Sequence, residues 1–402
     1  MISEDYRPPK IVFPHIQKTG GTSIIRWIAR HYAYQQVLSE ASTWKELFGL
    51  SAEVLEGKRF VRGHFGSGIV NVFGERGGFR PIALIRNPID RIVSHFWHLK
   101  RAPDAGKELA FVREDAFTIL DFLQHPKTQR LVSDYQTANY SSSAAQAQRG
   151  VVTVPGNPEI SPLNLGNAKA YLDRCDVVGV TEDMGAFVNA LSARFGFFAD
   201  TDLGKTRSYN GSEEPVVGIE DRVRELNKLD FELYEYAKKR AAMPTKSSSS
   251  STVANPNQVD PDGLVRWSAG EPFWGRGWSD FVRDKVRDHI WSGASNASMQ
   301  FSVSAGERYM ILITVLRFVA QIQSKCFSIV CNGTDIAPKL VSKATSGAPM
   351  IYAASLGKVE TGELTIEFAV DRLVGFGEPL SAEPDVERRG LALCSVDLLP
   401  CS

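Results

Sequence analysis

The pattern of apolar and polar positions divides the chain into two parts. In roughly the first 240 residues, short apolar runs alternate with segments in which apolar residues recur three or four positions apart. The runs begin at Ile11, Arg59, Pro81 and Asp176, and a last helical segment covers residues 219–240. Such runs predict buried parallel strands, and the periodic segments predict helices that flank them. This part is therefore expected to be an α/β domain.

Beyond residue 263 the pattern changes. Short β-rich runs, among them 309–318 and 363–370, are separated by Gly, Asn and Pro residues, which predicts an antiparallel β-sandwich. The stretch 244–262 is rich in Ser and Pro and includes five consecutive serines, so it cannot bury a core. We expect a linker there, between a first domain at 1–243 and a second at 263–402.

Composition and charge restrict the possible functions. The 402 residues include 46 Lys and Arg and 46 Asp and Glu, so no overall charge favours nucleic acid, and any anion site must be local. Five cysteines without a Cys-x-x-Cys pair indicate reduced thiols and no structural zinc site. The N-terminus lacks an apolar leader, and no apolar stretch is long enough to span a membrane. A cytoplasmic protein is expected.

The loop after the first strand carries the strongest chemical signal. It reads Lys18, Thr19, Gly20, Gly21, Thr22 and Ser23, and a helical segment follows. Glycines let the backbone approach a ligand, and the first N–H groups of a helix lack partners within it, so the loop is suited to cradle phosphate or sulfate. Lys18 adds a charge, and the hydroxyl groups add donors. The predicted fold is accordingly a P-loop-like parallel sheet, although Lys18 precedes the glycines, unlike the Lys of a Walker A loop.

A second anion-binding pattern follows the strand that begins at Pro81. Arg86 stands at its end, Asn87 and Pro88 form a strong helix start, and Ser94 lies about two turns along the helix. The guanidinium offers the two-pronged donor geometry that phosphate prefers. The apolar stripe of this helix includes Ile92 and Phe96, and the sequence predicts that four polar residues project from the other side. These are Arg91, Ser94, His95 and His98.

Together these motifs resemble the sulfotransferases that use 3′-phosphoadenosine 5′-phosphosulfate (PAPS), especially the carbohydrate and heparan-sulfate type. His-Ile-x-Lys-Thr-Gly-Gly-Thr-Ser is similar to their 5′-phosphosulfate loop, and Arg-Asn-Pro-x-x-Arg-x-x-Ser to their 3′-phosphate motif. The resemblance implies PAPS as co-substrate, PAP as product and no metal. It also implies that Lys18 stabilises the leaving group, that residues 19–23 bind the 5′ end, and that Arg86 and Ser94 bind the 3′-phosphate.

A histidine at a strand exit is the candidate base. His64 follows Gly63 at the end of the second strand, and the unperturbed pKa of histidine lies near neutrality. The resemblance implies that His64 removes the acceptor proton. Alternatively, His64 is a loop histidine that is held by a backbone carbonyl and has no catalytic role. His15 is the second candidate base, although its place in the first strand favours packing.

The acceptor class follows from the resemblance only in outline. We expect a hydroxyl of a carbohydrate or glycoconjugate, with a saccharide, a glycolipid precursor or a small alcohol as partners, in a bacterial enzyme. Two other functions stay open from the sequence. One is a P-loop kinase, and the other is a nucleotide-regulated glycan-binding protein whose function resides in the C-terminal β-sandwich. That sandwich is similar to the accessory domains of bacterial glycan-modifying proteins.

Overall fold

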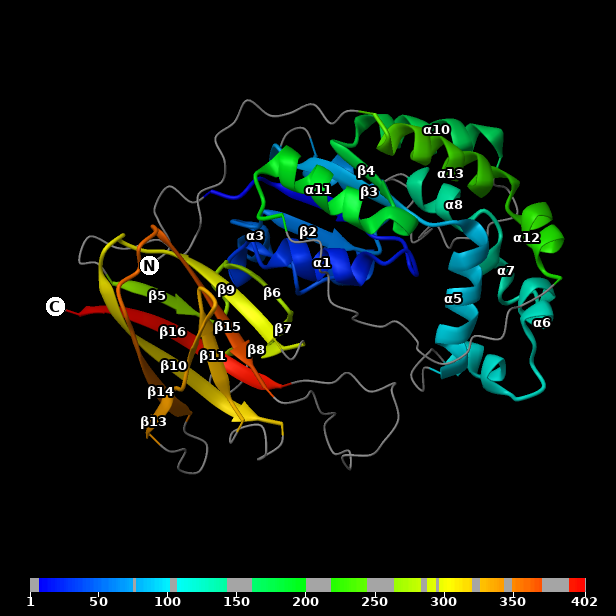
Figure 1. Cartoon of the computed structure of the whole chain (residues 1–402). Helices are drawn as coiled ribbons and strands as arrows, with labels where there is room; N and C mark the ends of the chain where they lie inside the picture. The colour runs from blue at the N-terminus through cyan, green and yellow to red at the C-terminus, as the bar shows by residue number, and fades with distance from the viewer. Residues whose placement is uncertain are drawn as a thin grey trace.

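A computed structural model gives the structure of the chain (Figure 1). The described residues are 7–74, 77–101, 107–142, 161–199, 218–243, 264–282, 288–293, 296–319, 326–342, 349–370 and 390–401. The predicted linker at 244–262 lies outside these residues, so the domain limits at 243 and 263 stay predictions. Residues 205–212 also lie outside them; their basic and polar sequence predicts a loop, either one that closes over the nucleotide or a plain surface loop. Within the described residues, no helix is both long and apolar enough to cross a bilayer.

The N-terminal domain is built on a four-stranded parallel sheet, as predicted. The strands are β1 (Ile11–Pro14), β2 (Phe60–Gly63), β3 (Arg80–Ile85) and β4 (Val177–Val180). Their spatial order is β2-β1-β3-β4, with every neighbouring pair parallel. All carboxyl ends therefore meet at one edge of the sheet, which brings the segments after β1, β2 and β3 together.

Helices cover both faces of this sheet. α1 (Gly21–Ala29) and α11 (Met184–Phe195) bury one face, because Ile24, Ile28 and Leu191 pack on the apolar side chains of β1 and β3. On the other face lie α4 (Ile69–Phe73), α8 (Tyr135–Tyr140), α10 (Pro162–Arg174) and α13 (Lys228–Ala241).

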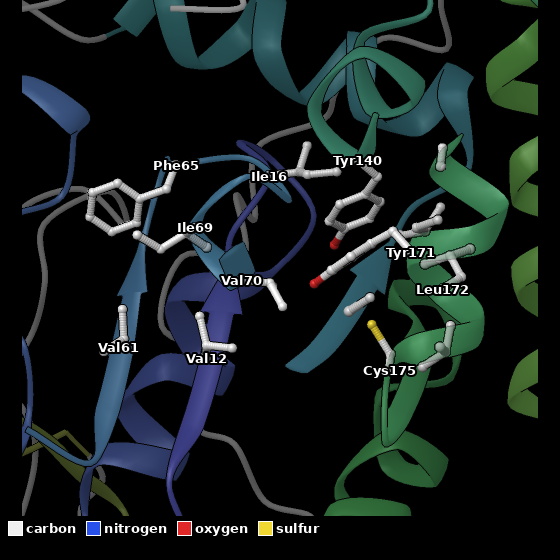
Figure 2. Close-up of a cluster of buried hydrophobic side chains, with 14 of the residues drawn as sticks. Val12, Ile16, Val61, Phe65, Ile69, Val70, Tyr140, Tyr171, Leu172 and Cys175 are labelled. Carbon is white, nitrogen blue, oxygen red and sulfur yellow. The ribbon is translucent and has the colours of Figure 1, made fainter. Parts of the chain in front are cut away.

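Two tyrosines help to join this second helical layer to the sheet. Figure 2 shows Tyr140 and Tyr171 beside Val12 and Val70 in the buried cluster. The Tyr140 hydroxyl lies 3.1 Å from both the N–H and the carbonyl oxygen of Leu84, and the Tyr171 hydroxyl donates to the Ile82 carbonyl at 3.2 Å. Both tyrosines therefore satisfy their polar atoms on β3 while burying their rings.

A third group of helices extends from the end of β3. α5 (Pro88–Arg101) packs its apolar stripe, including Ile92 and Phe96, against α6 (Ile119–Gln124) and α12 (Glu220–Leu226). The smaller helices are η1 (Tyr34–Gln36), α2 (Trp44–Phe48), α3 (Ala52–Leu55), η3 (Lys107–Arg113), α7 (Gln129–Val132) and η4 (Thr181–Asp183).

One predicted element differs from the structure. The expected helix over 219–240 is two helices, α12 and α13, which meet at Asn227. The Asn227 side chain is fully buried, donates to the Val223 carbonyl and accepts a hydrogen bond from the N–H of Asp134. A side chain that bonds to a distant backbone group in this way competes with helix continuation.

The C-terminal domain consists of two antiparallel sheets packed face to face, in agreement with the predicted sandwich. One sheet has the order β13-β14-β10-β16-β8-β7, with β5 also paired to β16, and the other has the order β12-β11-β15-β9-β6. Alternate residues of both sheets, such as Ile311 of one and Ile366 of the other, fill the core between them.

The first sheet of the C-terminal domain contains β5 (Val265–Ser268), β7 (Trp278–Val282), β8 (His289–Ser292), β10 (Arg308–Phe318), β13 (Lys339–Ser342), β14 (Met350–Leu356) and β16 (Leu391–Cys401). The second contains β6 (Trp274–Arg276), β9 (Asn296–Ser302), β11 (Ser328–Cys331), β12 (Thr334–Ile336) and β15 (Glu363–Ala369).

Candidate active site at the carboxyl edge of the parallel sheet

The loop between β1 and α1 has a tightly constrained backbone. Lys18 and Gly20 have φ values of 67° and 74°, in the left-handed region that non-glycine residues rarely adopt. A Cβ atom on Gly20 would lie 2.8 Å from Cε of Met184, and one on Gly21 would lie 2.0 Å from Nδ1 of His15. Glycine is therefore required at both positions, and the unusual φ of Lys18 places backbone strain within the candidate site.

This loop presents backbone donors at the start of α1. In the described part of the chain, no backbone carbonyl accepts a hydrogen bond from the N–H groups of Gly20, Gly21 or Thr22. No side chain caps the helix at Gly20, and the Thr22 side chain is exposed. These N–H groups are the donors that an anionic group at the helix start would use.

Thr19 differs from the other hydroxyl residues of the loop. Its side chain is fully buried, and its hydroxyl donates to the Ile16 carbonyl at 2.9 Å. Its own carbonyl accepts a hydrogen bond of 2.8 Å from the Thr181 hydroxyl, which also lies 3.2 Å from the Ile85 carbonyl. The Thr19 side chain thus holds the loop in place, and its hydroxyl proton is already used within the protein.

The structure brings the Lys18 loop and Arg86 together. Arg86 follows β3, and its Nη1 donates to the Lys18 carbonyl at 3.1 Å. Burial is the main cause of the lowered pKa values of His15 and His95, and the charge of Lys18 lowers both further. The ammonium group therefore lies near both the end of β1 and α5. The two motifs that were separate in sequence share one edge of the sheet.

Gln136 of α8 clamps the backbone of Arg86. Its Oε1 accepts from the Arg86 N–H at 3.0 Å, and its Nε2 donates to the Arg86 carbonyl at 2.8 Å. Gln136 is itself fully buried. A buried amide that makes both of these bonds fixes the direction in which the chain leaves β3, and so positions the Arg86 side chain.

Two aspartates lock the helix that carries Gln136. The Asp230 carboxylate accepts from the N–H groups of Gln136 and Thr137 at 3.0 and 2.7 Å, at the start of α8. The Asp134 carboxylate accepts from the N–H groups of Leu229 and Asp230 at 3.0 and 2.9 Å, at the start of α13. α8 therefore receives a capping carboxylate from α13, and α13 receives one from the residue that precedes α8, across more than 90 residues of sequence.

Burial raises the pKa values of both carboxyl groups. The pKa of Asp134 is raised to about 7 by burial and by the nearby Asp230. Burial also raises the pKa of Asp230, and the charge of Arg91 opposes this shift. The two carboxylates thus compete for ionisation in a confined space.

The prediction that Arg91 and His95 face away from the core is wrong. Both are buried, because α6, α7 and α8 cover that side of α5. Arg91 donates to the Leu131 carbonyl at 2.7 Å and lies 4.5 Å over the Tyr135 ring, and the His95 ring faces those of Phe122 and Tyr135.

Ser94 and the predicted helix start fit the proposed 3′-phosphate motif more closely. The Asn87 side chain accepts a hydrogen bond of 2.9 Å from the Ile89 N–H and so caps α5 as expected. The Asn87 N–H donates to Glu182 at 2.9 Å, and Glu182 also accepts from the Tyr234 hydroxyl at 3.1 Å. Ser94 is partly exposed one residue before His95, and its role in binding stays a prediction.

His64 lies at the exit of β2, with its ring tied to the neighbouring strand. The backbone N–H of His64 donates to the Ser42 carbonyl at 2.6 Å, and the ring Nδ1 lies 3.0 Å from the His15 carbonyl. A carbonyl only accepts, so Nδ1 carries the proton in this contact and Nε2 keeps its lone pair. Burial lowers the pKa of His64, the bond to His15 opposes that shift, and Arg62 adds to it. A neutral imidazole whose Nε2 carries a lone pair is a competent proton acceptor at neutral pH.

His15 packs directly against His64. The two ring centroids are 4.9 Å apart, and His15 covers Gly21. Burial, together with the charges of His64, Arg62 and Lys18, lowers the pKa of His15 to about 3. This burial agrees with the packing role expected for His15.

Three contributors to this edge were not predicted from the sequence. They are Gln136, which holds Arg86, the pair of Asp134 and Asp230, and Arg62 of β2, whose charge acts on both histidines. A glutamine or aspartate in a weakly patterned segment carries no local signal for a partner so far away. Arg62 is only two residues before His64, and that spacing was the available clue.

Comparison with known proteins identifies the class. The model of the sulfotransferase family matches residues 1–237, more than half of the chain. The chain therefore belongs to the sulfotransferase family.

Particular relatives act on heparan sulfate, by their names. Human heparan-sulfate 6-O-sulfotransferase 2 is 24% identical over 282 residues, which cover 57% of this chain and 44% of the human protein. The zebrafish (Danio rerio) heparan-sulfate 6-O-sulfotransferase 2 is 27% identical over 274 residues, which cover 57% of each chain. The chain thus spans about half the length of the curated relatives it matches.

Two solved structures illustrate the similarity to proteins of known structure. A family 35 carbohydrate binding module from Clostridium thermocellum is 10% identical, covering 34% of this chain and 98% of the module, with a TM-score of 0.24. The Podospora anserina GH26-CBM35 β-(1,4)-mannanase is 15% identical, covering 35% and 28%, with a TM-score of 0.20. Likenesses at these scores carry no argument about function.

Proposed function

We propose that the protein transfers a sulfuryl group from PAPS to a hydroxyl of a carbohydrate or glycoconjugate acceptor. The observation that carries this proposal is the contact between Arg86 and the Lys18 carbonyl, because it joins two anion-binding motifs at one sheet edge. A donor with phosphate groups at both its 5′ and 3′ ends needs two such motifs within the reach of one nucleotide. Membership of the sulfotransferase family supports the same donor.

In this proposal the Lys18 loop binds the 5′ end of the donor. The N–H groups of Gly20, Gly21 and Thr22, with the hydroxyls of Thr22 and Ser23, hold the 5′-phosphate, while buried Thr19 shapes the loop and contributes its backbone. Lys18 stabilises the charge that grows on the bridging oxygen as the sulfur–oxygen bond breaks. The Arg86 guanidinium and the Ser94 hydroxyl bind the 3′-phosphate and so select PAPS against nucleotides without it.

His64 accepts the proton of the acceptor. The hydroxyl oxygen of the acceptor attacks the sulfur, the bond from sulfur to the bridging oxygen breaks, and PAP leaves with that electron pair. The proton of the acceptor goes to Nε2 of His64, whose Nδ1 is held by the His15 carbonyl. Alignment of the two oxygens and stabilisation of charge supply the rest of the catalysis.

The acceptor is proposed to be a saccharide. The relatives named above modify heparan sulfate, and a glycolipid precursor or small alcohol offers the same reacting hydroxyl.

The two alternative functions, a P-loop kinase and a glycan-binding protein, have less support. A P-loop kinase needs the Lys after the glycines, and here Lys18 precedes them, while a purely glycan-binding protein does not account for the family match. The cytoplasmic location and bacterial origin stay predictions, since the relatives named here are vertebrate proteins.

A labelled-PAPS assay tests this function. The full chain is incubated with PAPS and a panel of heparan sulfate, other glycans, glycolipids and small alcohols, and mass spectrometry locates the added sulfate. We expect transfer to a saccharide, with His64→Ala lowering kcat by about 10²–10⁴-fold while PAP binding is retained. No transfer to any acceptor, or full turnover by His64→Ala, would contradict the proposal or the role of His64, respectively.

A further inference from the structure

The two domains meet at the end of α1 that is farthest from the Lys18 loop. The Arg30 carbonyl accepts from the Phe273 N–H at 2.8 Å, and the Tyr34 N–H donates to the Gly270 carbonyl at 2.7 Å. The Arg30 side chain also donates to the carbonyl of Gly275. Figure 1 shows β6 and β9 near this end of α1. Since α1 has nine residues, about 13 Å of helix separates this junction from the catalytic loop.

A cavity of about 320 Å³ lies at this junction. Phe198 and Ala199, which follow α11, form the wall on the side of the N-terminal domain, and residues of β6, β9 and β15 form the other wall. Cavities of this size are large enough to hold a small ligand or one unit of a larger one. Both domains contribute to the cavity, so it exists only in the assembled chain.

The sheet that forms this wall carries two rows of neighbouring side chains, of which Arg276, Ser298, Gln300 and Thr365 line the cavity. Strand register places Trp274, Gln300 and Thr365 side by side in one row. It places Arg276, Ser298 and Glu367 side by side in the next row, where the Arg276 guanidinium lies 3.8 Å from the Glu367 carboxylate.

This wall combines donors and acceptors without an excess of charge. The Gln300 amide and the Thr365 hydroxyl can each donate and accept, and Glu367 balances the charge of Arg276. Sugar hydroxyls likewise both donate and accept, whereas a phosphate would require more positive charge than this pair leaves.

Phe198, which lines the cavity, packs against Trp274 of β6. The rings of Phe198 and Trp274 are stacked, with centroids 5.4 Å apart and an angle of 20° between their planes. Within the described residues, the buried indole nitrogen of Trp274 has no hydrogen-bond partner. Aromatic rings beside polar groups suit the apolar C–H face and the polar rim of a sugar ring.

We propose that this cavity binds a saccharide unit of the acceptor, away from the reacting hydroxyl. The chemistry of the ligand follows from the cavity walls, and its identity as part of the acceptor rests on the proposed function. An oligosaccharide acceptor of several units then contacts the protein at both ends of α1, while a short acceptor contacts the catalytic edge alone. The C-terminal domain thereby favours long acceptors.

Binding of long, uncharged oligosaccharides, measured by calorimetry on the full chain saturated with PAP, tests the site directly. Ala199→Phe fills the cavity without removing a polar group, and the double variant Gln300→Ala with Thr365→Val removes two hydrogen-bonding groups. Each is expected to weaken binding of a long oligosaccharide by about tenfold or more. The matched control is Thr334→Val, which changes an exposed threonine of β12 at the opposite edge of the same sheet and should bind as the unmodified chain does.

Acceptor length separates this proposal from the proposed function. If both cavity variants raise the KM for long oligosaccharides and leave that for disaccharides unchanged, the cavity is an acceptor subsite. If sulfate transfer occurs but neither variant changes binding or KM, the cavity proposal is overturned and the proposed function stands. If the protein binds oligosaccharides through the cavity but transfers no sulfate, the cavity is a saccharide-binding site. Its role as an acceptor subsite is then contradicted together with the proposed function.

Discussion

The two edges of the parallel sheet are built in different ways. At the carboxyl edge, Lys18 and Gly20 adopt left-handed backbone conformations, and within the described chain the N–H groups of Gly20, Gly21 and Thr22 donate to no backbone carbonyl. At the opposite edge, Asp176 pairs with Arg80 and Arg194. The Asp176 carboxylate of that second edge is paired within the protein, whereas the first edge leaves backbone donors for a ligand.

This difference shows which edge of the sheet depends on close tertiary contacts. The carboxyl edge depends on close contacts, such as that of Gly21 with His15, and on the distant clamp of Gln136 on Arg86. The opposite edge joins the second domain through ordinary backbone hydrogen bonds. Substitutions at the first edge should therefore affect donor binding and catalysis, and substitutions at the second should leave donor binding unchanged.

Among the substitutions that compare the two edges, Gly21→Ala should produce the largest effect. The new Cβ would lie 2.0 Å from His15, and His15 in turn supports His64, so the loop or the histidine pair must move. We expect kcat/KM to fall by about 10²-fold or more and the unfolding free energy to fall by about 1–3 kcal/mol. Steady-state kinetics and urea denaturation measure the two quantities.

A glycine without close neighbours provides the control for Gly21. A Cβ atom on Gly166, within α10, would have no neighbouring atom within 4 Å, and the backbone of Gly166 is not left-handed. Gly166→Ala should stabilise the protein by about 0.5–1 kcal/mol, because alanine favours a helix interior, and leave activity unchanged. Equal losses from both substitutions would show that the loop is not specially constrained.

Gln136→Ala should weaken donor binding next most strongly. The substitution removes both hydrogen bonds to the Arg86 backbone and leaves a buried N–H and carbonyl without these partners. We expect the Kd for PAP to rise by about tenfold, corresponding to about 1.4 kcal/mol. The comparison is Asn139→Ala in the same helix, where the Asn139 side chain donates to the Tyr135 carbonyl rather than to Arg86. An unchanged PAP affinity in Gln136→Ala would refute the positioning role.

The Asp134–Asp230 pair predicts a pH dependence of stability. The pKa of Asp134 is raised to about 7 in the folded protein, so the folded state binds a proton that the unfolded state releases between about pH 4 and 7. This contribution to stability is full below about pH 4 and is lost as the pH rises through 7. With solvent screening, we expect Asp134→Asn to remove about 1–2 kcal/mol of this dependence, measured by urea denaturation at pH 5 and 8. The same pH dependence in the variant would exclude Asp134 as its source.

Tyr34→Ala should produce the smallest effect on donor binding. Its ring lies 4.5 Å from that of Phe281 at the domain junction, far from the Lys18 loop. We expect a loss of stability of about 1–3 kcal/mol and a Kd for PAP within about twofold of the unmodified chain, measured by denaturation and calorimetry. A large loss of PAP affinity would show that the two edges are coupled.

The sequence was sufficient for those features that have a local cause. The four parallel strands, the glycine loop and the Asn87 cap each follow from neighbouring residues, and the structure confirms them. The burial of Arg91 was not predictable in this way, since it depends on α7 and α8 covering α5.

Long-range partners explain the remaining differences at the site. The reciprocal caps of Asp134 and Asp230 and the break at Asn227 join segments that are about 90 residues apart, so no local pattern reveals them. Thr19 was expected to offer its hydroxyl to a ligand, but the Ile16 carbonyl lies within reach only once the loop is folded. Local patterns thus locate the donor loop, and tertiary contacts decide which of its groups stay available.

The most direct test of the two-motif donor site compares PAP with AMP, which lacks the 3′-phosphate, by calorimetry on the unmodified chain, Arg86→Ala and Lys18→Ala. We expect the unmodified chain to prefer PAP by about 10²-fold, Arg86→Ala to lose most of that preference, and Lys18→Ala to weaken both ligands alike. Equal weakening of PAP and AMP by Arg86→Ala would contradict the claim that the two motifs hold the two phosphate-bearing ends of one donor.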